Sequence, residues 1–186
     1  MVHSRATVWC VGTARRELLG RLVAEVAEHG LGDRSLRDLA AAVGSSHRML
    51  HYHFGSRDGL VAALVESVEA AQRAVLRELA GRISDPAELM REHWRSLTAP
   101  ELRPFIRLFF ECVGLTGGRG LTEPWLDLGS DLGVRLGVDF DAVDLQIGVA
   151  LTRGLLIDVL ASGDTTAADA AIERYLRVRE SHVLRS

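Results

Sequence analysis

The sequence comprises 186 residues, of which 47% are hydrophobic and 25% are charged, and its formal net charge is −3. The hydrophobic share is ample for one or two small soluble domains with packed cores. The two cysteines, Cys10 and Cys112, are too few for a disulfide framework, and no window of about 18 residues lacks a charge. The composition therefore argues against a disulfide framework and indicates no membrane span, and we expect a cytoplasmic protein.

Charge is unevenly distributed along the chain. Residues 1–60 carry eight arginines against six acidic residues, together with five of the seven histidines, whereas the remaining residues carry 14 arginines against 19 acidic residues. A weakly basic head on an acidic body is typical of a protein whose DNA binding is confined to one end. The negative net charge argues against a protein that coats nucleic acids generally.

The N-terminal residues 1–13 show neither a helical nor an alternating pattern, and we expect a flexible arm there. From residue 14 to residue 29, Leu18, Leu22 and Val26 recur at helical spacing opposite charged residues. This periodicity predicts a first amphipathic helix, which Gly30 ends.

The stretch from Ser35 to Gly59 has the spacing of two short helices joined by a tight turn. Its first helix has an apolar stripe at i, i+3, i+4 and i+7, formed by Leu36, Leu39, Ala40 and Val43. Ser35 and Asp38 give the Ser-x-x-acid signal of a capped helix start. Gly44 is suited to the left-handed conformation that ends this helix, and Ser45 or Ser46 can cap a second helix that ends near Phe54. The pattern predicts a helix-turn-helix.

The second helix separates an anchoring side from an outward side. At about 100° per residue, Leu50 and Phe54 fall on one side, whereas Arg48 and Tyr52 fall on the other. Met49 and His51, on either side of the outward pair, complete a face of guanidinium, phenol, imidazole and thioether groups. Such a face suits the DNA major groove, because arginine pairs with a guanine edge and hydroxyl or imidazole groups donate to phosphate oxygens.

Together these residues resemble the DNA-binding region of the TetR family of bacterial transcriptional regulators. The resemblance covers roughly residues 14–64, and several spacings agree at once. It lies in Leu36-Arg37-Asp38-Leu39-Ala40, Ala42-Val43-Gly44, Leu50, Phe54, Ser56-Arg57 and Leu60.

The recognition helix departs from the family's usual pattern. His51 precedes Tyr52 where tyrosine commonly precedes histidine, and His47, Arg48 and Met49 replace the more usual lysine, glycine and threonine. These positions face DNA in the family, so the resemblance predicts the scaffold but not the operator sequence. We expect Arg48 to contact bases, with Tyr52 and Arg57 on phosphates. The implied DNA contacts are Ser35, Arg37, Ser46, His47, Arg48, Met49, His51, Tyr52 and Arg57.

A long helix from about Ser56 to Ala80 follows, with its apolar stripe on one side and Gly81 after it. Proline and glycine then divide the chain into further helices, and no strand pattern competes with them. We expect about nine helices in an all-α fold. The expected division is an arm over 1–13, a helix-turn-helix DNA-binding domain over 14–59, and a helical ligand-binding and dimerisation domain over 60–186. The five expected body helices span about 86–97, 101–113, 124–136, 142–162 and 166–179.

Other motifs carry no chemistry that we adopt. His47 and His51 are four residues apart, as two metal ligands on one helix would be, but no acidic or cysteine ligand lies near them in sequence. The glycine-rich stretch 114–120 lacks the Gly-Lys-Ser/Thr ending of a phosphate-binding loop. No nucleophile signature is present. We therefore expect no catalytic residues, no metal and no cofactor, and so no enzyme.

The family resemblance implies a ligand cavity among the C-terminal helices. Three of the five phenylalanines cluster between Phe105 and Phe110, although core packing explains any single one of them equally well. A small, largely apolar effector would be held by aromatic groups and oriented by a few polar ones. The residues expected to bind it are His93, Trp94, Phe105, Phe109 and Trp125.

The expected helix over 142–162 is apolar along most of its length and includes small residues that permit close helix approach, such as Gly148 and Gly154. The resemblance implies that this helix and the last one pair with their counterparts across a two-fold axis, while the alternative is a buried helix of a monomer. The expected dimer residues are Leu145, Gly148, Val149, Thr152 and Leu156.

These expectations combine into one functional hypothesis. The chain is expected to be a cytoplasmic, homodimeric repressor that binds double-stranded DNA at a palindromic operator and is released by a small-molecule effector. The alternative is a helical small-molecule sensor or carrier that does not bind DNA, and an enzyme of helical-bundle type comes third.

Overall fold

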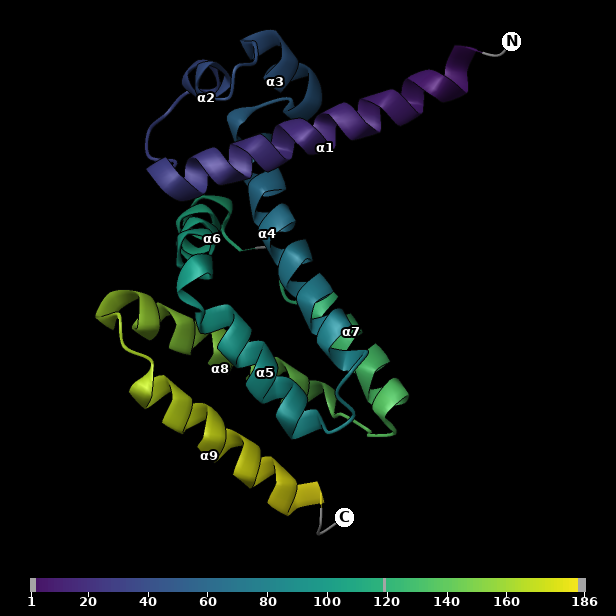
Figure 1. Cartoon of the computed structure of the whole chain (residues 1–186), viewed down its shortest axis with the longest axis vertical. Helices are drawn as coiled ribbons and strands as arrows, with labels where there is room; N and C mark the ends of the chain where they lie inside the picture. The colour runs from purple at the N-terminus through teal and green to yellow at the C-terminus, as the bar shows by residue number, and fades with distance from the viewer. Residues whose placement is uncertain (1–2, 119, 184–186) are drawn as a thin grey trace. The chain divides into compact units, whose positions relative to one another are not determined.

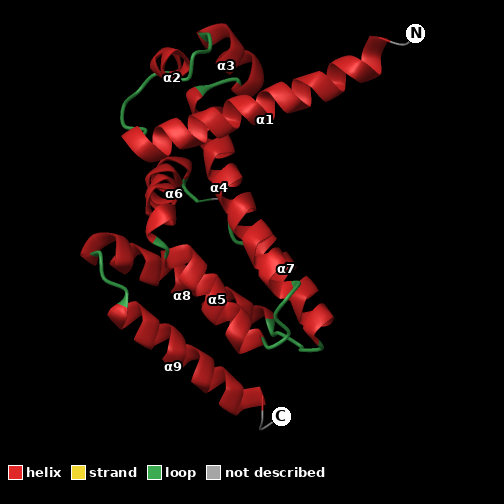
Figure 2. Ribbon diagram, in the orientation of Figure 1, coloured by secondary structure: helices red, strands yellow, loops and turns green. Residues whose placement is uncertain are grey.

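The computed structural model describes residues 3–118 and 120–183, with side chains over 13–118 and 120–179. Across this part of the chain every regular element is a helix, which confirms the all-α prediction (Figure 1, Figure 2). Nine α-helices and one short 3₁₀-helix occur there. Their bounds are α1 His3–His29, α2 Leu36–Ala42, α3 His47–Phe54, α4 Arg57–Ala80, α5 Pro86–Thr98, η1 Pro100–Leu102, α6 Arg103–Thr116, α7 Glu123–Leu136, α8 Ala142–Ser162 and α9 Thr166–Val183.

The first helix begins earlier than the apolar spacing predicted. α1 starts at His3, whereas the amphipathic pattern begins only after Ala14. The segment before Ala14 contains no proline, so nothing in it blocks the extension of a helix that is anchored further along. The role of residues 1–13 as an arm stays a prediction.

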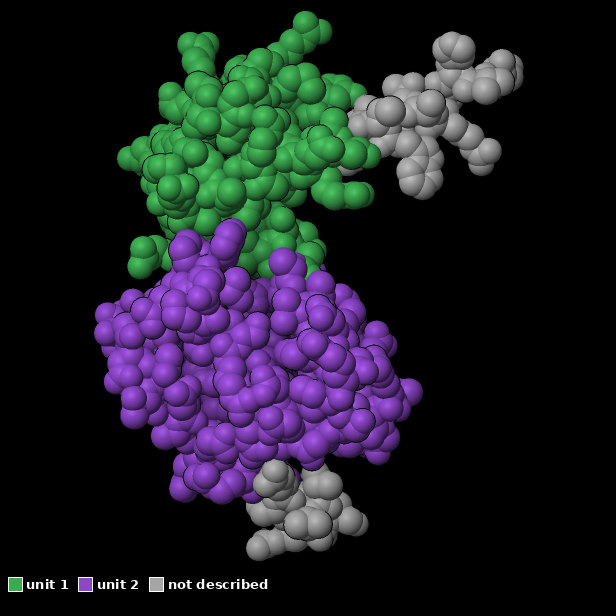
Figure 3. Space-filling view, viewed as in Figure 1, with its two compact units in different colours: residues 1–70, 107–118 green, residues 71–106, 119–186 purple. Residues whose placement is uncertain are grey.

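The helices form two compact units. The first comprises Met1–Ala70 and Arg107–Gly118, and the second comprises Ala71–Ile106 and Arg119–Ser186 (Figure 3). Both α4 and α6 therefore contribute residues to each unit. The predicted boundaries at residues 13 and 59 separate segments by their expected function and not by compactness, so they stay predictions.

In the first unit, α2 begins at the predicted capping box. The Ser35 hydroxyl accepts from the Asp38 backbone N–H at 3.3 Å, and the Asp38 carboxylate accepts from the Ser35 backbone N–H at 2.9 Å. After α2, Gly44 has a φ of +62°, and the Ser45 N–H donates to the Ala40 carbonyl at 2.8 Å. This bond satisfies one of the last carbonyls of the helix and turns the chain toward α3.

The start of α3 and the start of α4 are also capped by serines. The Ser46 hydroxyl accepts from the Met49 N–H at 3.2 Å, which selects Ser46 from the two predicted caps. The Ser56 hydroxyl accepts from the Gly59 N–H at 3.0 Å at the start of α4. Gly59 is required there, because a Cβ atom at this position would lie only 2.1 Å from the Phe54 carbonyl oxygen.

The second unit is built around an apolar cluster, defined here as the buried side chains of four residues from α4, α5 and α7. Partly buried apolar residues, including Leu76 and Trp125, pack against it. α8 packs against α7 and α9, and α5 packs against both α8 and α9 (Figure 1). The apolar cluster consists of Ala80, Leu89, Leu128 and Leu132.

Candidate functional site

The recognition helix α3 has the two sides that its sequence predicted. Leu50 is fully buried and Phe54 nearly so, whereas Tyr52 is 66% exposed and Met49 is 41% exposed. The outward face is defined as the exposed side chains of His47, Arg48, Met49, His51 and Tyr52. The rings of His47 and His51 stack on this face, with centroids 6.3 Å apart. The outward face therefore combines one permanent cation with hydrogen-bonding rings on a short helix.

Two arginines of α1 donate hydrogen bonds to backbone carbonyls of the helix-turn-helix. The Arg15 guanidinium lies 5.2 Å from the centre of the Phe54 ring, and its Nε–H donates to the His53 carbonyl at 3.4 Å. The Arg21 guanidinium donates to the Val43 carbonyl at the end of α2 at 2.8 Å. The amphipathic pattern of α1 gave no sign of these bonds, because both join residues more than 20 positions apart.

The loop between α1 and α2 is held by side chains of opposite charge. From α6, the Glu111 carboxylate accepts from the backbone N–H groups of Leu31 at 3.2 Å and Gly32 at 2.8 Å. From α4, the Arg57 guanidinium donates to the carbonyls of Arg34 at 3.0 Å and Gly32 at 2.5 Å. The loop clamp, defined as Glu111 and Arg57 with this loop, fixes the entry to α2.

The loop clamp changes the interpretation of two residues. Arg57 was expected to hold a phosphate, but its guanidinium is bonded to the protein backbone, and we now assign it a positioning role. Glu111 was not among the predicted site residues. Its sequence context, an acid after a run of aromatic residues, does not show that it reaches a loop about 80 positions away.

Next to Glu111, Cys112 is fully buried. Burial, helped by the neighbouring Glu111 charge, raises the pKa of its thiol to about 11. The thiol is therefore protonated at neutral pH and is a packing group rather than a nucleophile. Within the described residues, no group of three or more histidine, cysteine or acidic side chains is arranged to hold a metal ion.

The capping box also perturbs an acid. The Ser35 hydroxyl and backbone N–H both donate to the Asp38 carboxylate, and these bonds lower the pKa of Asp38. The hydroxyl of Ser35 is thereby engaged at the start of α2, while Arg37 beside it is exposed.

In the second unit, α5 and α7 bring together two of the predicted ligand residues. The rings of His93 and Trp125 lie with their centroids 5.8 Å apart and tilted by 43°. His93 is 4% exposed, and burial lowers the pKa of its imidazole to about 4, so it is neutral at physiological pH. The Arg73 guanidinium lies 5.9 Å from the Trp125 ring centre.

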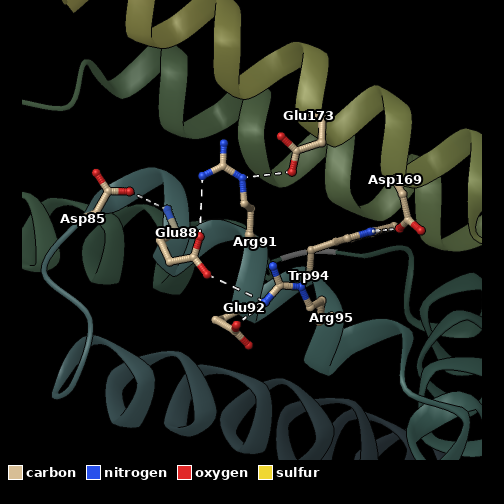
Figure 4. A network of polar contacts seen from close by, with 8 residues as sticks. All are labelled: Asp85, Glu88, Arg91, Glu92, Trp94, Arg95, Asp169 and Glu173. Atoms are coloured by element: carbon tan, nitrogen blue, oxygen red, sulfur yellow. Dashed lines mark hydrogen bonds and ion pairs between the residues drawn. The ribbon is translucent and has the colours of Figure 1, made fainter.

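Trp94, although adjacent to His93, hydrogen-bonds to a different helix, α9. Its Nε1–H donates to the Asp169 carboxylate of α9 at 2.6 Å, beside an ion pair between Arg91 of α5 and Glu173 of α9 at 2.9 Å (Figure 4). Consecutive helical residues point about 100° apart, so His93 and Trp94 serve different contacts. Trp94 packs α5 against α9.

The two predicted phenylalanines belong to different units. Phe105 is half-buried in the second unit, whereas Phe109 is buried in the first, where its ring meets Phe110 edge to face at 5.1 Å. Thus His93 and Trp125 are the predicted ligand residues that a ring contact joins directly.

The N-terminal helices of the chain match a known protein family. The sequence model of the bacterial regulatory proteins of the tetR family matches residues 19–64. This range includes all of α2 and α3 and parts of α1 and α4. The DNA-binding helices of the chain are therefore those of the TetR family of transcriptional regulators.

Solved structures share the fold of this chain over most of its length. A TetR-family transcriptional regulator from Pectobacterium atrosepticum matches with a TM-score of 0.70 at 20% identity, covering 96% of this chain and 94% of that one. A TetR-family regulator from Marinobacter aquaeolei VT8 matches with a TM-score of 0.59 at 20% identity, covering 88% and 93%. At these identities the likeness concerns the fold.

A third similar structure has a stated physiological role. It is the fatty acid degradation regulator FadR from Bacillus halodurans, with a TM-score of 0.59 at 16% identity, covering 87% of this chain and 93% of that chain. Among the curated proteins, no sequence matches this chain.

Helix α8 is apolar but mostly uncovered. Its length and composition would suffice to cross a membrane, with a mean hydropathy of 1.5, yet only 11% of the 18-residue window is buried. The exposed apolar face is defined as Val143, Ile147 and Ile157, which are 66%, 46% and 51% exposed. Spacings of four and ten residues put these three on one side of the helix.

One of the expected dimer residues is buried within its own chain. Leu156 is only 6% exposed, so it packs into its own chain rather than lying on the uncovered side of α8. The other four, Leu145, Gly148, Val149 and Thr152, are half-buried. Nothing in the sequence distinguished Leu156 from Ile157, because both are large aliphatic residues in a helix that is apolar around most of its circumference.

Proposed function

We propose that this TetR-family regulator binds a palindromic operator as a homodimer, represses transcription from it, and is released by a small, largely apolar effector. The observation that carries the proposal is the outward face of α3. That face is exposed, cationic and rich in hydrogen-bonding groups, and it stands on a helix anchored by Leu50 and Phe54 and capped by Ser46. Affinity and register come from phosphate contacts and specificity from base contacts.

Within the outward face the roles follow from chemistry. Arg48 is the group able to pair bidentately with guanine O6 and N7, so it reads a base. Tyr52, His47 and His51 present donors suited to phosphate oxygens, and the Met49 thioether offers an apolar contact. At the start of α2, Arg37 contributes a phosphate contact, and the helix starts at Ser35 and Ser46 offer backbone N–H groups to phosphate oxygens.

The exposed apolar face of α8 supports the homodimer. An uncovered run of large aliphatic side chains on a long helix costs free energy in water, and a second copy of the same face removes that cost. A membrane is the other apolar surface that could cover such a helix. We favour the dimer because α8 carries Asp144, Arg153 and Asp158 along its length and packs against three neighbouring helices.

The effector proposal rests on the second unit. Aromatic rings from α5 and α7, with an apolar cluster beside them, provide the lining that apolar ligands prefer. That one protein of similar fold regulates fatty acid degradation agrees with an apolar effector. Effector and operator affinity are reciprocally coupled, so a compound that weakens DNA binding is itself bound more weakly by the DNA complex.

A mobility-shift assay on the DNA upstream of the regulator's own gene tests the DNA-binding part of the proposal. We expect a shift with the native protein and none with a variant carrying Arg48→Ala and Tyr52→Ala, because both substitutions remove contacts without touching the anchoring side of α3. The matched control, Glu28→Ala, changes an exposed residue of α1 and should shift DNA normally. A protein that binds apolar compounds but shifts neither this DNA nor a random pool would instead be the sensor or carrier without DNA binding.

A further inference from the structure

Three buried polar atoms of the second unit have no hydrogen-bond partner among the described residues. One is Nε of Arg103, whose guanidinium already donates through another nitrogen to the Gly163 carbonyl at 3.1 Å. The other two belong to side chains without any such bond: Oε1 of Gln72, which is 7% exposed, and Nδ1 of His93, which is 4% exposed. Buried polar groups are nearly always paired, and an unpaired one destabilises a fold. Their retention in one compact unit points to a partner that is not part of the chain.

Both residues lie at one end of the apolar cluster. His93 is four residues after Leu89 of the cluster on α5, so it lies one helical turn from the cluster. Gln72 is four residues before Leu76 on α4, and Leu76 packs against the cluster. Trp125 of α7 packs against the cluster and also against the His93 ring. Three helices thus place Gln72, His93 and Trp125 within about one helical turn of the cluster or of a residue packed against it, and Gln72 and His93 are called the polar layer.

The charge of this layer decides which ligand chemistry fits. Arg73 is buried and lies over the Trp125 ring, and it already has an interaction of its own. Glu69, also buried, is four residues before Arg73 on α4, at the spacing of a helical ion pair. The two unpaired groups of the polar layer, an amide and an imidazole whose pKa burial lowers to about 4, are both uncharged at physiological pH.

We propose that Gln72 and His93 together bind the hydroxyl group of an aromatic effector whose remaining surface is apolar. A hydroxyl donates one hydrogen bond and accepts others, so it can donate to Gln72 Oε1 while it accepts from the His93 Nδ1–H. The aromatic body then lies against Trp125 and the apolar cluster. A carboxylate is disfavoured, because it would bring a charge to two neutral groups in a buried site.

This inference rests on the proposed effector function and names the chemical class of the effector. Isothermal titration calorimetry on the full-length protein tests it with three matched probes, 4-butylphenol, butylbenzene and 4-butylbenzoate. We expect the phenol to bind about tenfold more tightly than the hydrocarbon, which corresponds to one or two buried hydrogen bonds, and the benzoate to bind no better than the hydrocarbon. Tightest binding of the benzoate, or binding of none of the three, would overturn the assignment.

Substitution of the polar layer separates a ligand-binding role from a structural one. Gln72→Leu should reduce the preference for the phenol over butylbenzene to about twofold, and without a probe its melting temperature should equal or exceed that of the native protein, because no protein hydrogen bond is lost. A lower melting temperature with an unchanged preference would assign Gln72 to structure alone and overturn the proposal.

Thr98→Val is the matched control on α5, because the Thr98 hydroxyl already donates to the Trp94 carbonyl at 3.0 Å. This substitution should leave the phenol preference unchanged, and a loss equal to that in Gln72→Leu would also count against the polar layer. The operator shift of the native protein is measured separately. An intact shift without phenol preference contradicts this inference alone, whereas loss of the shift contradicts the proposed function.

Discussion

At the residue scale, Arg48 and Arg57 show how position decides what an arginine does. Arg48 is exposed on α3, whereas the Arg57 guanidinium is bonded to two carbonyls of the loop before α2. From sequence alone both could be phosphate or base contacts, because nothing local reveals the backbone oxygens that Arg57 meets more than 20 positions away. The outward side chains of α3 could be predicted, because helical periodicity alone determines them.

These two arginines should respond differently to truncation. Arg48→Ala should cost about 1–3 kcal/mol of operator binding and relax the preference at one base-pair position, with stability unchanged. Arg57→Ala should lower the melting temperature, because two carbonyls of the loop before α2 lose their donor, and should leave the salt dependence of DNA binding nearly unaltered. Binding titrations at several salt concentrations and thermal unfolding measure both effects. A salt slope reduced by about one in Arg57→Ala, at an unchanged melting temperature, would restore the phosphate contact.

Glu111 is expected to act through the loop that it holds. Glu111→Ala should lower the free energy of unfolding by about 1–3 kcal/mol, because two backbone N–H groups lose their acceptor, and Glu111→Gln should lose less, since one amide oxygen remains. Denaturant unfolding of both variants, beside Glu28→Ala as an exposed control, measures the difference. Equal stability of all three variants would show that the loop does not depend on Glu111.

The burial of His93 predicts that the free energy of unfolding depends on pH. The pKa of His93 is about 4 in the folded chain against an ordinary value of 6.5, so the unfolded chain binds the proton more readily. The free energy of unfolding is therefore not reduced by His93 above pH 6.5, and it declines as the pH falls from 6.5 toward 4. Between pH 7.5 and 5 the native protein should lose about 2 kcal/mol more than His93→Phe does. Parallel pH profiles of the two proteins would contradict the buried neutral imidazole.

At the element scale, the ends of α2, α3 and α4 were easier to predict than the covered side of α8. The ends of α2, α3 and α4 depend on local signals, a serine cap at the start and a glycine after the end, and these were predicted nearly to the residue. The side of α8 that its own chain covers depends on neighbouring helices. Because α8 is apolar around most of its circumference, its residue spacing could not show which side that was.

The exposed apolar face of α8 gives the prediction at this scale. Ile157→Arg should convert the proposed dimer to a monomer that remains folded, because the new charge lies on a side that water reaches in the single chain. Leu156→Arg, one position earlier, should unfold the chain by placing a charge in its own core. Sedimentation velocity and circular dichroism distinguish these outcomes. A fully dimeric Ile157→Arg protein would place the dimer contact elsewhere.

At the scale of the whole molecule, the family assignment and the fold come from separate observations. The family match covers residues 19–64, and the likeness to solved regulators covers most of the chain. An effector changes DNA binding only if it has different affinities for two conformations of the protein, one that can bind DNA and one that cannot. Shifting the population from 99:1 to 1:99 needs about 5.5 kcal/mol of such a difference. The two hydrogen bonds proposed at Gln72 and His93 can supply only part of that, so the apolar contacts of the effector must supply the rest.

Selection of bound DNA from a random pool with the full-length protein tests the central claim most directly. A two-fold dimer that reads DNA with the outward face of α3 should enrich inverted repeats whose half-site centres are roughly 10 bp apart or a multiple of that. Repeating the selection with Arg48→Ala should relax the same single position in both half-sites. Enrichment of direct repeats or of isolated half-sites would contradict the two-fold arrangement, and no enrichment at all would contradict operator recognition by α3.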